Sequence, residues 1–91
     1  MSESADPAGA RRHLNAVRRL VLEILAEGPL ATRDEVAARW AERKPQLTPR
    51  HQDALPRMAG EILWRLENLG WVERADGVYR VTDSGRAIAD L

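Results

Sequence analysis

Residues that could carry out chemistry are sparse in this chain. It contains no cysteine, which excludes a disulfide framework, a thiolate metal site and a cysteine nucleophile. The histidines are His13 and His51, and the spacing His51-x-Asp53 resembles one corner of a metal or acid–base site. No further ligand cluster lies nearby in the sequence, and no glycine-rich phosphate loop exists. We therefore expect a protein that is not an enzyme and that binds neither a metal nor a cofactor.

The charge balance does not by itself indicate a nucleic-acid partner. The 14 basic residues are cancelled by 14 acidic ones. A strongly basic composition favours nucleic acid because lysine and arginine neutralise phosphates, and that support is missing here. No apolar run approaches the roughly 20 residues that a membrane span needs. We expect a cytoplasmic protein without a membrane partner.

Capping signals divide the chain into elements. We expect residues 1–7 to form a flexible tail and residues 8–91 to form a single domain. Apolar residues at offsets of three and four predict a first helix that starts at Asp6-Pro7 and ends at Gly28-Pro29, with the glycine in the left-handed cap conformation. The run from Thr32 to Glu35 has the pattern of a capping box, so a second helix follows and ends near Lys44.

The start of the third helix has two interpretations. Thr48-Pro49 has the pattern of an N-cap followed by a first helical residue. It opens either a separate short turn or the third helix itself, with an irregularity at Pro56. We favour the separate turn and a third helix over about 56–69, capped by Gly70. Its outer face then carries Arg57, Glu61, Trp64, Arg65 and Asn68.

A hairpin follows the third helix. Asp76-Gly77 separates two short strands, 71–75 and 78–82, and predicts a two-residue turn of the primed type. This turn fixes the register of the two strands. One face of the hairpin is then apolar, and the other face carries a pair of opposite charges. A short helix from Asp83 ends the chain. The expected fold class is mainly α with a small antiparallel β-hairpin, and the paired residues are Val72 with Val81, Arg74 with Tyr79, and Glu73 with Arg80.

Three stretches resemble winged helix-turn-helix domains: TRDEVAARW, ILWRLENLGWVER and GVYRVTDSGRAI. The resemblance covers about residues 14–91. Among subfamilies, the chain is similar to prokaryotic transcription regulators of the multidrug-resistance and phenolic-acid-decarboxylase classes, and to the N-terminal domains of Mrr-type restriction endonucleases. The segment 45–55 is longer than the turn that many such regulators have between helices two and three.

The resemblance implies a DNA-binding, transcription-regulatory module. Its third helix would lie in the major groove of double-stranded DNA and its hairpin, residues 71–82, would be the wing. We also expect a homodimer, which would read two half-sites. The implied DNA contacts are Arg57, Trp64, Arg65 and Asn68 on the third helix, Arg50 and Gln52 just before it, Arg74 and Arg80 on the hairpin, and Thr32 and Arg33 at the start of the second helix.

The alternative is a protein-interaction module within a larger assembly. Glu61 lies four residues before Arg65, and the two can form a solvated ion pair instead of binding DNA. Trp64 is a residue type that often anchors protein partners. In the first helix, Leu20 and Leu22 widen the apolar arc. We favour the interpretation that a second layer of the core covers these two leucines. The other interpretation is that they contact a second chain in a dimer.

Overall fold

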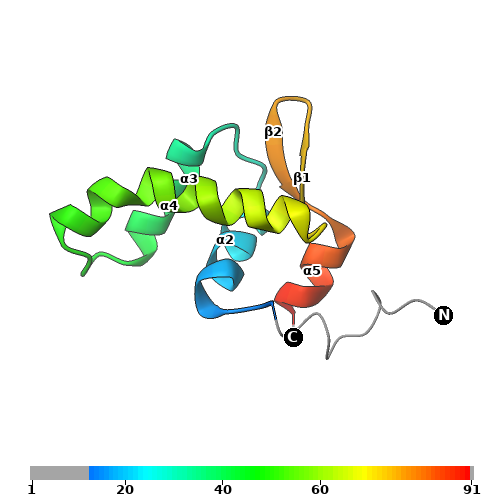
Figure 1. The fold of residues 1–91 in the computed structure, drawn as a ribbon, viewed down its shortest axis with the longest axis horizontal. Helices are drawn as coiled ribbons and strands as arrows, with labels where there is room; N and C mark the ends of the chain where they lie inside the picture. Colours follow the sequence, from blue (N-terminus) through cyan, green and yellow to red (C-terminus); the bar gives the residue numbers. More distant parts are fainter. Residues whose placement is uncertain (1–12, 91) are drawn as a thin grey trace.

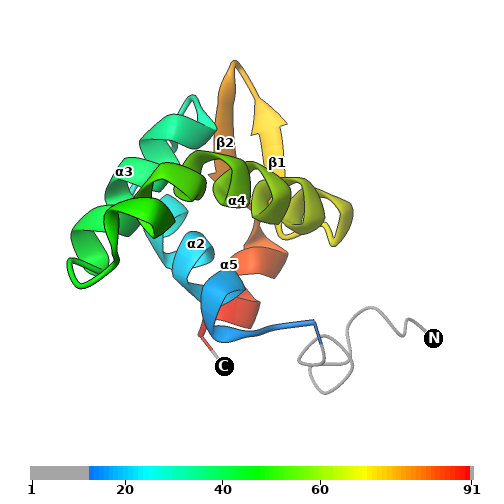
Figure 2. The same cartoon turned by 60° about the vertical axis from the view of Figure 1, so that its left-hand side comes forward.

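The computed structural model describes residues 13–90, and within them no helix is long and apolar enough to cross a membrane. In Figure 1, α4 crosses the front of a helical body formed with α2, α3 and α5, while the hairpin stands out from one side. Figure 2 shows the same hairpin projecting beyond the helices. The elements are α2 (Ala16–Ala26), α3 (Arg33–Arg43), α4 (Pro49–Asn68), β1 (Val72–Ala75), β2 (Val78–Val81) and α5 (Asp83–Ala89).

One apolar core lies between α2, α3, α4 and the base of the hairpin. Its most deeply buried side chains come from the three longer helices, and the buried set among the described residues contains no polar or charged side chain. Leu22 is completely buried there, and Leu20 packs against the core as a partly buried side chain. The favoured covering by the core is therefore confirmed for Leu22, which offers no surface to a partner, whereas Leu20 is only partly buried.

The helix α2 starts later than predicted. The expected start at Asp6-Pro7 lies outside the described residues, but residues 13–15 are not helical. Asn15 is the N-cap, and its side-chain oxygen accepts a hydrogen bond of 2.8 Å from the Arg18 N–H. Because asparagine satisfies one of the free N–H groups of the first turn, it provides the start signal that the prediction placed farther upstream.

The end of α2 also differs from the prediction. Gly28 does not adopt the left-handed conformation, which among the described glycines is found at Gly70 and Gly77. Instead, the Gly28 N–H donates to the Leu25 carbonyl at 3.1 Å, three residues back. The last turn tightens into this shorter hydrogen-bonding pattern, and Pro29 cannot continue it.

The predicted capping box at the start of α3 is confirmed. The Glu35 N–H donates to the Thr32 hydroxyl at 3.1 Å, and the Thr32 N–H donates back to a Glu35 carboxylate oxygen at 3.1 Å. The helix α3 buries Val36, Ala37 and Trp40. The cap fixes where α3 begins, so it also fixes the position of its first residue, Arg33.

The helix α4 is one continuous helix of 20 residues, so the favoured separate turn is wrong. Thr48 caps its start by accepting a hydrogen bond of 3.3 Å from the His51 N–H. Pro56 lies inside the helix and cannot donate the usual backbone hydrogen bond. Leu55 and Ala59, on either side of it, are both buried in the core. Their burial offsets the missing bond and keeps the helix continuous.

The two left-handed glycines set the geometry of the hairpin. Gly70 follows Leu69, the C-cap of α4, and the Trp71 N–H donates to the Leu66 carbonyl at 3.0 Å, which is the pattern of a Schellman cap. Asp76 and Gly77 have φ of 55° and 78°, as a primed turn requires. The predicted register is confirmed at Val72 with Val81, Glu73 with Arg80, and Arg74 with Tyr79.

The hairpin is tied to the connection between α2 and α3. Leu30 forms an antiparallel bridge with Tyr79, in which the Tyr79 N–H donates to the Leu30 carbonyl at 2.7 Å. On the other side of the hairpin, Thr82 caps α5, and Ile88 packs into the core. These contacts hold the hairpin at a fixed place beside α3 and α4.

Candidate functional site

An open groove of about 650 Å³ lies between the start of α3, the outer face of α4 and the hairpin. Its lining contains four arginines and two glutamates, which leave an excess of positive charge, together with two aromatic rings. We call it the arginine groove. It is lined by Arg33, Arg57, Gly60, Glu61, Trp64, Arg65, Glu67, Arg74 and Tyr79.

The outer face of α4 supplies most of the groove. Arg57, Glu61 and Arg65 are spaced four residues apart, and this spacing places them along one side of the helix. Arg33 joins them from α3. A Cβ atom on Gly60 would lie 3.1 Å from the Cδ of Arg33, so the glycine lets the Arg33 stem lie close across α4.

The hairpin closes the other side of the groove. Arg74 and Tyr79 are opposite each other in the register, and both line the groove. The guanidinium carbon of Arg74 lies 5.0 Å from the centre of the Tyr79 ring, which is a cation–π distance. The bridge from Leu30 holds Tyr79 at its backbone. The connection between α2 and α3 therefore helps to position this face of the hairpin.

The arginines of the groove have no carboxylate partner among residues 13–90. The salt bridges of this part of the chain are Arg39–Glu42 and Arg43–Glu27, and neither lies in the groove. The ion pair considered between Glu61 and Arg65 does not form. Instead, the Arg65 guanidinium carbon lies 5.6 Å from the centre of the Trp64 ring. The guanidinium groups are thus available to an anionic ligand.

Arg80 lies away from the groove. Side chains alternate along a strand, so Arg80 points to the opposite face of the hairpin from Tyr79. The register places it opposite Glu73, yet within the described residues the two do not form a salt bridge. The predicted opposite-charge pair is thus in register but does not form an ion pair.

Two other predicted contacts use their polar groups within the protein. The Asn68 amide donates a hydrogen bond of 2.7 Å to the Trp64 carbonyl. Thr32 uses its hydroxyl and its N–H in the capping box, and the neighbouring Ala31 N–H donates to Glu35 at 2.7 Å. The Ala31 and Thr32 N–H groups are therefore already bonded to the Glu35 carboxylate, and the Glu35 N–H is bonded to the Thr32 hydroxyl.

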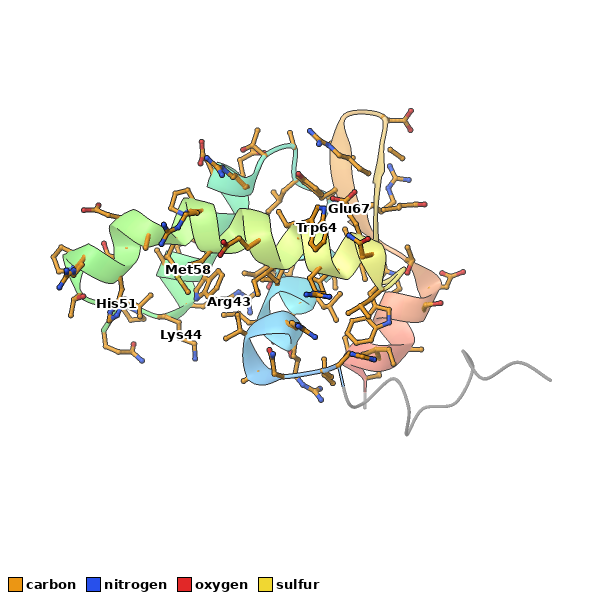
Figure 3. All side chains as sticks on the ribbon, viewed as in Figure 1. Arg43, Lys44, His51, Met58, Trp64 and Glu67 are labelled. Carbon is orange, nitrogen blue, oxygen red and sulfur yellow. The ribbon has the colours of Figure 1, made fainter. Side chains whose placement is uncertain are left out.

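Arg50 and Gln52 lie in the first turn of α4. Figure 3 shows that end of the helix, marked by His51, well apart from Trp64 and Glu67, which lie beside each other near the hairpin. The Gln52 amide donates to the Leu47 carbonyl at 3.0 Å. The structure thus brings together half of the predicted site: Arg33, Arg57, Trp64, Arg65 and Arg74.

Gly60, Glu67 and Tyr79 also line the groove but were not predicted as site residues. Gly60 carried a usable signal, because glycine inside a helix is unfavourable by about 1 kcal/mol relative to alanine and often marks a close approach. Tyr79 could have been found from its pairing with Arg74. Glu67 gave no signal that distinguishes it from a solvated helix residue.

The structure was searched for metal-binding groups, and the chain was compared with known proteins. Residues 13–90 contain no group of three or more histidine, cysteine, aspartate or glutamate side chains arranged to hold a metal. The His51 ring nitrogen Nδ1 lies 3.1 Å from the Thr48 hydroxyl, at the cap of α4. Comparisons with protein-family models, with curated proteins and with solved structures find no match to this chain.

Proposed function

We propose that this chain is a winged-helix DNA-binding module and that the arginine groove contacts DNA. The observation that supports this proposal is the convergence of four arginines, from α3, α4 and the hairpin, on one groove without carboxylate partners in the described residues. Guanidinium groups bind phosphates with two parallel hydrogen bonds. Neutralising phosphates releases counterions, and this release drives most of the sequence-independent affinity for DNA.

The order of elements is consistent with a winged helix. A bridge at Leu30 precedes α3, α4 follows it, and the hairpin stands beside α4. In the proposed complex α4 enters the major groove, where Arg57 and Arg65 reach base edges or phosphates. Arg74 holds a phosphate from the hairpin, which acts as the wing. A transcription-regulatory role and a homodimer that reads two half-sites remain part of this proposal.

A protein-interaction module is the second candidate function. The observation that favours it is Trp64, which is 61% exposed although tryptophan is a common anchor of protein interfaces. Val17, on α2, is the other exposed large apolar side chain among the described residues. Because Trp64 is larger and more exposed than Val17, it would be the main anchor of such an interface.

A salt titration distinguishes the two candidates. A labelled duplex of random sequence is titrated with the protein at about 50 and about 200 mM salt, and binding is followed by fluorescence anisotropy. We expect binding at low salt and a steep loss of affinity at the higher salt. Absence of binding even at about 50 mM salt would contradict DNA binding and favour the protein-interaction module. Sedimentation of the free protein in the same buffers measures whether it is a dimer.

A further inference from the structure

Trp64 is the exposed tryptophan of the described chain. Its side chain is 61% exposed, whereas Trp40 and Trp71 are each only 5% exposed. It lies beside Glu67 on the part of α4 that faces the hairpin (Figure 3). An indole ring has one N–H donor and no acceptor, so it carries little of the hydrogen-bond code of a base-pair edge. Reading a closed duplex does not explain this residue.

Each aromatic ring of the groove has an arginine beside it. Arg65 lies 5.6 Å from the Trp64 ring, and Arg74 lies 5.0 Å from the Tyr79 ring. The groove therefore alternates cationic groups with π-faces across two elements. Surfaces that bind single-stranded nucleic acid combine the same features, because the cations follow the phosphates while unpaired bases stack on the rings. The large exposed area of Trp64 leaves room for such a base.

The two glutamates of the groove fit unpaired bases better than a phosphate backbone alone. Glu61 and Glu67 line the groove without a salt bridge to any described residue. A carboxylate repels phosphates, but it accepts hydrogen bonds from the amino groups of bases. In a duplex the Watson–Crick edges that carry many of these donors are occupied by pairing. In a single strand they are free to meet a carboxylate.

We propose that the arginine groove takes DNA with unpaired bases, one of which stacks on Trp64 while Arg65 and Arg74 hold the adjoining phosphates. This inference rests on the proposed DNA-binding function. It narrows the ligand from any duplex to DNA that contains a single-stranded stretch.

The intrinsic fluorescence of Trp64 tests the inference. The full chain is titrated with a strand of about 12 nucleotides that contains only cytosine and thymine, which cannot pair with itself, and with a blunt duplex of random sequence. We expect the strand to quench the fluorescence and to bind at least about fivefold more tightly than the duplex. Trp40 and Trp71 are buried, so the quenching should come from Trp64.

Two substitutions at the same position separate stacking from folding. Trp64→Ala should weaken strand binding by about 5- to 150-fold, the range of one lost base–aromatic stack, and should change duplex binding by less than about threefold. Trp64→Phe keeps an aromatic ring, so it should retain strand affinity to within about threefold while the quenching disappears. His51→Ala, at the far end of α4, is the matched control and should change neither affinity (Figure 3).

The outcomes distinguish this inference from the proposed function. If the duplex binds but the strand does not quench Trp64, or if Trp64→Ala weakens both ligands equally, the stacking inference is wrong and DNA binding stands. If neither DNA binds at low salt, both are wrong. Should Trp64→Ala unfold, as judged by circular dichroism, the result with Trp64→Phe decides the question, because loss of strand affinity in that folded variant would contradict stacking.

Discussion

The two exposed arginines of the hairpin form a matched pair for testing where DNA lies. Arg74 lines the arginine groove, and Arg80 points to the opposite face of the same two strands. Replacing either by glutamine removes one positive charge and keeps a polar side chain on the same element. Any general effect of net charge is then equal in the two variants, and only the position of the charge differs.

The magnitude follows from the number of groove arginines. With four of them each neutralising one phosphate, log K should fall against log salt with a slope of about −3.6. A rise from about 50 to about 200 mM salt then costs about 150-fold in affinity. For Arg74→Gln the slope should be about −2.7 and the loss about 40-fold, while Arg80→Gln should behave like the wild type.

Fluorescence anisotropy with a labelled duplex at several salt concentrations measures these slopes. If the salt dependence of Arg80→Gln is as shallow as that of Arg74→Gln, the groove is not the DNA-binding face. A wild-type slope near zero would refute phosphate contacts altogether.

Three further predictions concern the framework that holds the groove, each measured by urea denaturation. Gly85→Ala should lower the free energy of unfolding by about 1–3 kcal/mol, because the added Cβ would lie 2.1 Å from the Trp71 carbonyl oxygen. Gly28→Ala is the control, because the space around its Cβ is open. Equal effects of the two substitutions would show that the contact at Gly85 does not matter. Thr32→Ala removes the capping box and should lower the free energy of unfolding by about 1 kcal/mol. An unchanged urea midpoint would show that the cap does not contribute to stability. Pro56→Ala should stabilise by roughly 1–3 kcal/mol, since alanine restores a helical N–H; destabilisation would mean that the proline ring contributes more through packing.

Features decided by a few neighbouring residues could be predicted from the sequence. The capping box at Thr32, the cap at Gly70 and the turn at Asp76-Gly77 depend on local hydrogen bonds or on backbone conformations that few residue types adopt. For the same reason the strand register and the separation of core and outer faces on α4 were predicted correctly. Local signals nevertheless misplaced the start of α2, because Asn15 was overlooked as a cap.

Features decided by tertiary packing could not be predicted. Pro56 was compatible with either the start or the interior of a helix. Because Leu55 and Ala59 are buried in the core, the helix continues through Pro56. The groove depends on how α3 and the hairpin sit against α4, so the sequence did not show that Arg33 and Tyr79 line the same groove. The outer face of α4 was identified, but its sequence left open whether Glu61 and Arg65 form an ion pair.

Charge reversal on α4 tests the central claim most directly. The double variant Arg57→Glu, Arg65→Glu places two negative charges in the arginine groove, at exposed positions whose replacement leaves the core intact. Circular dichroism first establishes that the variant is folded, and its affinity for duplex DNA is then measured at low salt beside the wild type. Loss of binding is the result that DNA contact through the groove predicts. Binding that survives both reversals would show that the DNA-binding face lies elsewhere.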